Sequence, residues 1–188
     1  MANDSVALVL LAAGQARRFG GDKLRAGFAG STVLDKAMTA AEAASFDARY
    51  LVVTPDAPPS ERAASWQRVV NPDADSGVAS SIRAGVTAAS SHSRLVIALA
   101  DMPFVTPHHL DALATGEGVL FTRQADGRSG SPAAFPREAY ARLLTLDGDR
   151  GAAALDWLGA TLLAPDDADM LQDIDTPNDL EKARRSRR

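Results

Sequence analysis

Short apolar runs alternate with helical patterns along the first two-thirds of the chain. The runs are rich in valine and leucine, which favours buried strands, and the segments between them repeat apolar residues at helical spacing. We expect strands at residues 6–11, 50–53, 69–70, 95–99 and 119–122, and helices at residues 33–44, 78–89 and 107–113. The alternation predicts an α/β fold, a three-layer α/β/α sandwich around a mostly parallel, Rossmann-like sheet. Ligands of such sheets bind at the carboxyl ends of the strands.

The pattern changes after residue 123, where glycine, serine and proline suggest turns around an extended insertion. Helices are expected near residues 136–144 and 150–158, and short extended runs at 161–163 and 171–174. Thr176 and Pro177 then open a closing helix, with Asp179 placed to complete a capping box. We therefore expect a single domain with a βα part at 1–123, an insertion at 124–165 that forms a substrate-side cap, and a closing segment at 166–188.

Composition narrows the possible chemistry. The chain of 188 residues has no cysteine, which excludes disulfides, thiolate metal sites and a cysteine nucleophile, so any metal must be held mainly by oxygen. No apolar run approaches the roughly 18–20 residues that span a membrane, and no positive charge precedes the first apolar run, so a cytoplasmic location is expected. The net charge of −4 includes a basic tail beyond residue 181, so the remaining body is more acidic and would not attract nucleic acid. The tail itself is expected to be a solvated, frayed end, with an anionic partner as the alternative.

The first candidate site is the stretch LAAGQARRFGGDK, residues 11–23, which begins where the first expected strand ends. Its small residues let backbone N–H groups approach an anion closely, and its cations supply charge for phosphates. It is neither a Walker A loop nor a dinucleotide fingerprint, because the Gly-Lys-Ser/Thr ending and the G-x-G-x-x-G pattern are both absent. The alternative interpretation is a mobile basic loop that binds nothing.

Two acidic segments could hold a metal. Asp101 lies just beyond an apolar strand, where a carboxylate is well placed to hold Mg²⁺ together with phosphate oxygens. Asp173 and Asp175 fall on one face of an extended segment, and a cation would relieve their repulsion. Local hydrogen bonding to a turn remains an alternative for Asp101, and complementing a helix dipole remains one for Asp175.

The polar segment 71–81 runs into an expected helix N-terminus, which can bind a phosphate or a base edge, or can simply be an ordinary capped helix. His92, His108 and His109 have no spacing that indicates a metal pair or a triad, so we expect all three at the surface.

Taken in this order, the segments resemble the nucleotidyltransferases of the molybdenum-cofactor type, and most closely the molybdenum cofactor cytidylyltransferases. The likeness extends over nearly the whole chain. The family's motifs are met by Leu11, Ala12, Ala13, Gly14, Arg18, Phe19, Gly20 and Lys23, by Asn71, Pro72, Gly77 and Ser81, by Asp101-Met102-Pro103, and by residues 173–180.

The resemblance implies a role for each segment. The backbone of residues 11–14 would hold the base and ribose, Arg18 and Lys23 the triphosphate, and Asp101 with Asp175 an Mg²⁺ ion, with Mn²⁺ as a possible substitute. Further nucleotide contacts are expected from Asn71, Gly77, Ser80 and Ser81. Ala13 favours CTP over GTP in this family, and its methyl group would narrow the space beside the base.

Two departures from the family pattern lie on the expected acceptor side. Relatives often carry Gly-His-Pro where this chain has Gly130-Ser131-Pro132, and G-D-x-G-A-R where it has residues 148–153. Acceptor contacts are expected from Gly130, Pro132, Asp149 and Asp173. The resemblance predicts transfer of CMP to the phosphate of molybdopterin, with a molybdenum hydroxylase as a possible partner. The alternatives are a sugar-phosphate or polyol-phosphate acceptor, a guanylyltransferase, and a non-catalytic molybdenum cofactor carrier.

Overall fold

The computed structural model describes residues 5–14, 19–58, 62 and 65–186. Seven strands of this part form one sheet in the order β5-β4-β1-β6-β8-β7-β9. Their bounds are β1 (Val6–Leu11), β4 (Ala48–Val53), β5 (Gln67–Val70), β6 (Arg94–Leu99), β7 (Leu120–Arg123), β8 (Ser129–Pro136) and β9 (Thr161–Leu163). Neighbouring strands pair in parallel, except that β8 runs antiparallel to both β6 and β7. The predicted mostly parallel sheet is confirmed.

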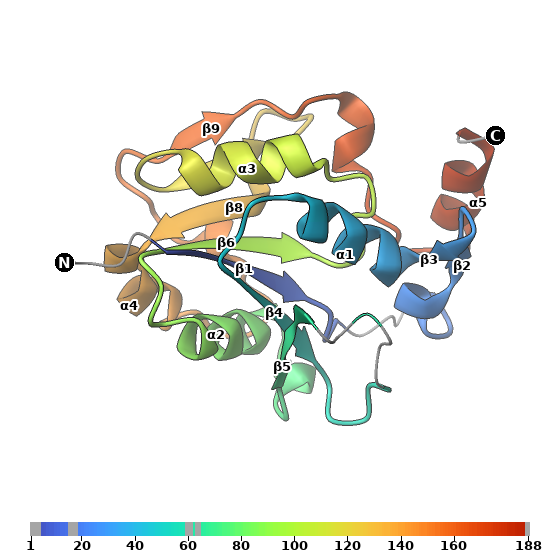
Figure 1. Cartoon of the computed structure of the whole chain (residues 1–188), viewed down its shortest axis with the longest axis horizontal. Coiled ribbons are helices and arrows are strands. Elements are labelled where there is room, and N and C mark those ends of the chain that lie inside the picture. The colour runs from blue at the N-terminus through green and yellow to red at the C-terminus, as the bar shows by residue number, and fades with distance from the viewer. Residues whose placement is uncertain (1–4, 15–18, 59–61, 63–64, 187–188) are drawn as a thin grey trace.

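Helices cover both faces of the sheet (Figure 1). Helices α1 (Val33–Ala43) and α3 (Pro107–Thr115) lie on one face, and α2 (Val78–Ala88) and α4 (Tyr140–Leu143) lie on the other. Short 3₁₀ turns connect the elements at Lys23–Arg25, Ala74–Ser76, Arg137–Ala139, Ala152–Ala154 and Ala168–Leu171. The three-layer α/β/α arrangement predicted from the sequence is therefore confirmed. Within the described residues, no helix combines the length and apolar character needed to cross a bilayer.

Alternation along β1 shows how the sheet builds a core on each face. Leu8 and Leu10 are buried in the core below α1 and α3, while Ala7 and Val9 are buried in the core below α2. Successive side chains of a strand point to opposite faces, so a strand covered on both sides must be apolar throughout. Gly85 allows α2 to come close, because a Cβ at this position would lie 2.3 Å from Val9.

A third, smaller core holds the end of the chain in place. Helix α5 (Pro177–Ser186) lies beside the hairpin of β2 (Gly27–Phe28) and β3 (Ser31–Thr32) (Figure 1). The expected capping box is confirmed, since the Thr176 and Asp179 backbone N–H groups each donate to the other residue's side chain. Arg184 donates to the Gly27 carbonyl at 2.6 Å, so the expectation of a frayed tail is wrong as far as this residue. Arg187 and Arg188 lie outside the described residues.

The expected cap at 124–165 is wrong for its longest element, because β8 is an interior strand of the sheet. Its apolar residues 133–135 are buried, and the glycine and proline before them begin the strand instead of forming turns. A helix at 150–158 is also wrong, since one 3₁₀ turn forms there and Trp157 packs on Phe121 and Phe135 instead. Residues 171–174 do not form a strand.

Two of the three histidines are not surface residues. His109 is 1% exposed, and its Nε2 hydrogen-bonds to the Thr122 hydroxyl at 2.8 Å. His92 is half-buried and hydrogen-bonds to the Tyr50 hydroxyl at 3.2 Å. His108 is exposed as predicted. The prediction failed because helical spacing places His109 on the inner side of α3, where a hydroxyl partner offsets the cost of burial.

Candidate active site

The candidate site lies where the neighbouring strands β1 and β6 end at the same edge of the sheet. Leu11 pairs with Leu99 in register, so residues 12–14 and Asp101 emerge side by side. The chain returns to this point near its end, because the Ile174 N–H donates to the Asp101 carbonyl at 2.9 Å. Three segments far apart in sequence therefore converge, as the order of the motifs predicted.

Lys23 bridges the two carboxylates that the sequence assigned to a metal. Its Nζ lies 2.7 Å from Oδ2 of Asp101 and 2.8 Å from Oδ1 of Asp175. Burial by itself lowers the pKa of Lys23, but the charges and hydrogen bonds of the two carboxylates outweigh it, so the pKa lies above its ordinary value. Lys23 is therefore a positively charged group at neutral pH, held by a pair of anions.

The carboxylates retain capacity for a divalent cation. Oδ1 of Asp101 is buried and has no hydrogen-bond partner among the described residues. Asp173 lies close by, and loss of solvation, followed by the negative charges of Asp175 and Asp101, raises its pKa. No cluster of three or more His, Cys, Asp or Glu side chains within the described part of the chain is suited to a metal. Two carboxylates completed by water and phosphate oxygens are what Mg²⁺ usually takes, so the residues fit this ion.

Asn71 holds together the loop that precedes α2. It is 2% exposed, and its amide nitrogen donates to the hydroxyls of Ser80 and Ser81 at 2.9 and 3.0 Å. Its carbonyl oxygen accepts from the Asp73 N–H at 3.0 Å. Because these side chains bond to one another, they fix the position of the loop at 71–77, and the nucleotide contacts expected from Asn71, Ser80 and Ser81 stay a prediction.

Gly77 packs against the loop that carries Asp149. Its φ is +110°, and a Cβ there would lie 2.3 Å from the Gly148 carbonyl oxygen and 2.6 Å from Oδ1 of Asp149. The same carbonyl accepts from the Ala79 N–H at 3.1 Å. The structure therefore places Asp149 against the start of α2, whereas Asp173 lies near Asp101 and Asp175. The sequence had grouped Asp149 and Asp173 together.

Gly130 and Pro132 lie in β8, at the end of this strand nearest to the carboxyl end of β6. The Pro132 carbonyl accepts from the Thr122 hydroxyl at 2.6 Å, and a Cβ at Gly130 would meet the side chain of Gln124. Both residues therefore lie at the same edge of the sheet as Asp101, where an acceptor would approach.

The loop after β1 is partly described. Ala13 is 2% exposed and its methyl group packs in the core below α2, so it is not open to a base in the way the sequence suggested. Gly14 and Lys23 line a cavity of about 940 Å³ that extends between the start of α1 and the ends of β4 and β5. Arg18, the other predicted triphosphate ligand, lies outside the described residues.

Comparison with known proteins identifies the family. Residues 8–161 match the family described as the MobA-like NTP transferase domain. The chain belongs to this family. It is 30% identical to the purine catabolism protein PucB of Bacillus subtilis over 197 residues, which covers 95% of each chain.

Solved structures agree with the fold of this MobA-like NTP transferase. Rv0371c from Mycobacterium tuberculosis gives a TM-score of 0.77 at 25% identity, over 95% of this chain and 97% of that one. A complex of Rv0371C with manganese gives a TM-score of 0.68 at 24% identity, over 97% and 99%. A nucleotidyl transferase from Methanothermobacter, Mth528, gives 0.82 at 22% identity, over 98% of each chain.

Sequence reasoning missed the polar residues on the far side of the cavity in this NTP transferase. Thr54 and Asp56 line it just after β4, and Arg68 lines it from within β5. For Thr54 and Asp56, the position just after a strand was the available signal, because ligands gather at carboxyl ends. They belong to no motif that marked them out from other loop residues.

Proposed function

We propose that this MobA-like NTP transferase moves CMP from CTP to the phosphate of a small acceptor, with molybdopterin as the preferred acceptor. The observation that carries the proposal is the meeting of Lys23, Asp101 and Asp175 at the edge of the sheet where the loop after β1 begins. A cation and two carboxylates at this position suit a triphosphate accompanied by a divalent ion.

The reaction needs positioning more than proton transfer. An acceptor phosphate oxygen, already ionised near neutral pH, attacks the α-phosphorus of CTP, and the bond from that phosphorus to the bridging oxygen breaks to release pyrophosphate. Lys23 supplies positive charge for the triphosphate, and Arg18 is proposed to assist it. Asp101 and Asp175 would hold Mg²⁺, which neutralises the charge that develops on the phosphate oxygens.

Three observations support the choice of metal and nucleotide. The oxygen ligands suit Mg²⁺ or Mn²⁺, and the related Rv0371C is described as a manganese complex. Ala13 matches the cytidine-using form of the first motif. Because the Ala13 methyl is buried, its effect on the base would act through the position of the neighbouring backbone.

Pyrophosphate release tests the proposal directly. Purified protein is incubated with Mg²⁺, each of CTP, GTP, ATP and UTP, and either molybdopterin, a sugar phosphate or a polyol phosphate. The expected result is release with CTP and molybdopterin. Release with another pair would correct the substrates, and no release with any pair would contradict nucleotide transfer.

Asp101→Asn should lower kcat/KM by a factor on the order of 100, because the carboxylate charge that holds the divalent ion is lost. Glu117→Gln is the matched control, since Glu117 is an exposed carboxylate in the loop before β7, away from the site. Full turnover by Asp101→Asn would refute the assignment of this metal ligand.

A further inference from the structure

The position between the two proposed metal carboxylates, Asp101 and Asp175, is filled by the chain's own cation, Lys23. The Lys23 ammonium hydrogen-bonds to Asp101 and Asp175, which are 78 and 152 residues away in sequence. The side chain of Lys23 is 9% exposed, whereas those of Asp101 and Asp175 are 22% and 38% exposed. Lys23 thus has the most deeply buried side chain of the three.

This pairing places Lys23 in competition with a divalent cation. Both need the same carboxylate oxygens, and two cations held by one pair of carboxylates repel each other strongly where water is largely excluded. An ion that enters must therefore displace the ammonium or accept fewer protein ligands. Each choice weakens metal binding to the protein alone.

The pairing is not that of a fully satisfied structural ion pair. Oδ1 of Asp101 remains buried and without a hydrogen-bond partner among the described residues, although Oδ2 is bonded to Lys23. Buried carboxylate oxygens normally have partners, so one ligand position beside the ammonium is held ready for a second species. The ammonium offsets the negative charge of the two carboxylates, but it leaves Oδ1 of Asp101 without a hydrogen bond.

The side chain of Lys23 also has space into which it can move. The cavity of about 940 Å³ lies directly beside it, lined as well by Gly14 and the start of α1. The four-carbon stem of a lysine lets the ammonium move without movement of the backbone. A triphosphate lying along the loop after β1 would offer it a more strongly charged partner.

We propose that Lys23 keeps divalent cations out of the site until nucleotide phosphates draw its ammonium away from Asp101 and Asp175. The metal then binds with the nucleotide or after it, and it does not bind firmly to the free protein. This inference rests on the proposed nucleotide transfer for the identity of the anion, but the competition between Lys23 and the metal stands without it.

Titration of the nucleotide-free protein with Mn²⁺ alone tests the inference, with free Mn²⁺ followed by electron paramagnetic resonance. Lys23→Met should bind Mn²⁺ about 10- to 100-fold more tightly than the natural protein, because a charged hydrogen-bonding competitor is removed. Lys182→Met, which removes the same charge from an exposed position on α5, should leave Mn²⁺ binding unchanged. The double variant Lys23→Met with Asp175→Asn should lose the gain.

Thermal unfolding provides a second readout that also reports whether the variant folds. Without metal, Lys23→Met should unfold at a lower temperature because the two carboxylates lose their counter-ion. Added Mn²⁺ should raise its unfolding temperature more than that of the natural protein, since tighter binding to the folded state gives greater stabilisation.

Equal Mn²⁺ affinity in the natural protein and a folded Lys23→Met would overturn the inference, as would a gain that survives Asp175→Asn. These outcomes are separable from failure of the proposed function. If the natural protein releases pyrophosphate but Lys23→Met gains no affinity, the inference alone fails. If Lys23→Met gains affinity but no nucleotide is consumed, the inference stands and nucleotide transfer fails.

Discussion

Replacing Asn71 by alanine tests whether a buried hydrogen-bond network positions the loop at residues 71–77. The amide side chain is 2% exposed and makes three hydrogen bonds, to Ser80, Ser81 and the Asp73 N–H. Alanine removes all three and leaves polar groups that were paired with Asn71 inside the protein. A net cost of about 0.5–1.5 kcal/mol for each bond gives a loss of about 1.5–4.5 kcal/mol in the free energy of unfolding.

Urea unfolding measures this loss as a lower midpoint, and an unchanged slope would show that the folded and unfolded states themselves are preserved. Ser76→Ala is the matched control, because the Ser76 hydroxyl also donates within this loop, to the Asp73 carbonyl at 2.8 Å, but is exposed. Its loss should stay within about 0.5 kcal/mol. A cost for Asn71→Ala as small as that of the control would refute the view that the network holds the loop.

The same variant also tests what the loop does. If its backbone meets the nucleotide, Asn71→Ala should raise the KM for CTP more than it lowers kcat, because the loop then loses ground-state contacts. An unchanged KM in a folded Asn71→Ala protein would contradict a nucleotide role for this segment. A stability loss alone would then mark Asn71 as a purely structural residue.

Three further changes test the remaining structural arguments. Gly77→Ala places a Cβ 2.3 Å from the Gly148 carbonyl oxygen at a φ of +110°, so it should lower the free energy of unfolding by about 1–3 kcal/mol, measured with urea. An unchanged free energy of unfolding would contradict the close packing of the two loops. Burial lowers the pKa of His109, so the unfolded state binds the proton more readily and the free energy of unfolding should fall as the pH drops below about 6.5. His109→Gln should flatten that dependence in urea titrations between about pH 7.5 and 5, and an unchanged slope would remove His109 as its source. Arg94→Ala should lower the free energy of unfolding by about 2–4 kcal/mol, because this side chain donates to two backbone carbonyls. It should leave kcat/KM for CTP unchanged, because these bonds lie at the far end of the sheet. A fall in kcat/KM without loss of stability would contradict that reasoning.

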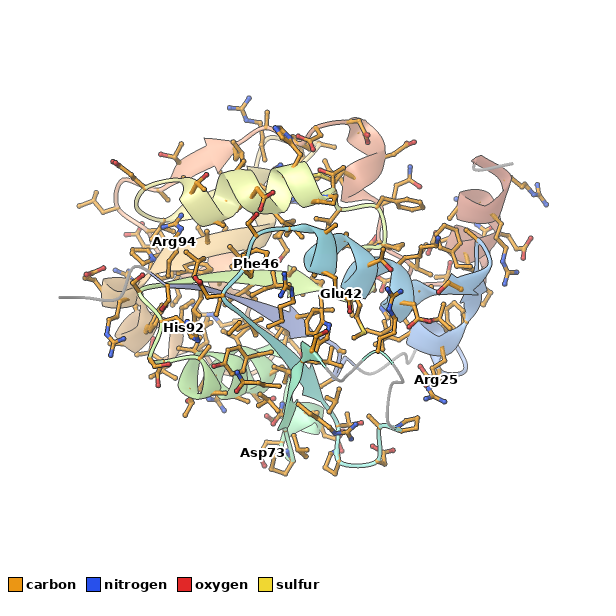
Figure 2. All side chains as sticks on the ribbon, in the orientation of Figure 1. Arg25, Glu42, Phe46, Asp73, His92 and Arg94 are labelled. Carbon is orange, nitrogen blue, oxygen red and sulfur yellow. The ribbon has the colours of Figure 1, made fainter. Side chains whose placement is uncertain are left out.

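Arg94 shows why a buried charge need not mark a site. It begins β6, whereas Asp101 follows the other end of that strand, and six residues of extended chain separate the two ends by about 20 Å. Figure 2 shows Arg94 and His92 at one end of the molecule and Arg25, beside Lys23, toward the other. The two buried cations therefore lie at opposite ends of the sheet, and only Lys23 lies at the end that carries the candidate site.

The main strands and helices of the first two-thirds of the chain were predictable, because the apolar residues that each one buries recur at a distinctive spacing. Strand β1 matches its expected bounds, and β6 and α2 differ from theirs by one residue. In residues 124–165 the helix near 136–144 and the extended run at 161–163 are confirmed, but the prediction failed at 129–132, where glycine and proline had two possible meanings. At the start of β8 they belong to a strand that is held by its neighbours on both sides, and local sequence carries no information about those neighbours.

The convergence of the candidate segments was predictable, but the pairing of their side chains was not. Parallel register brings the ends of β1 and β6 together, so the order of the motifs was enough to place residues 12–14 beside Asp101. Register does not decide which partner a charged side chain chooses when no ligand is bound. Lys23 was expected to face a triphosphate, yet without one the concentrated negative charge of Asp101 and Asp175 holds it more strongly than water would. The residue that neutralises phosphate in the proposed reaction thus also neutralises Asp101 and Asp175, because both tasks need a buried positive charge on a long side chain at the same place.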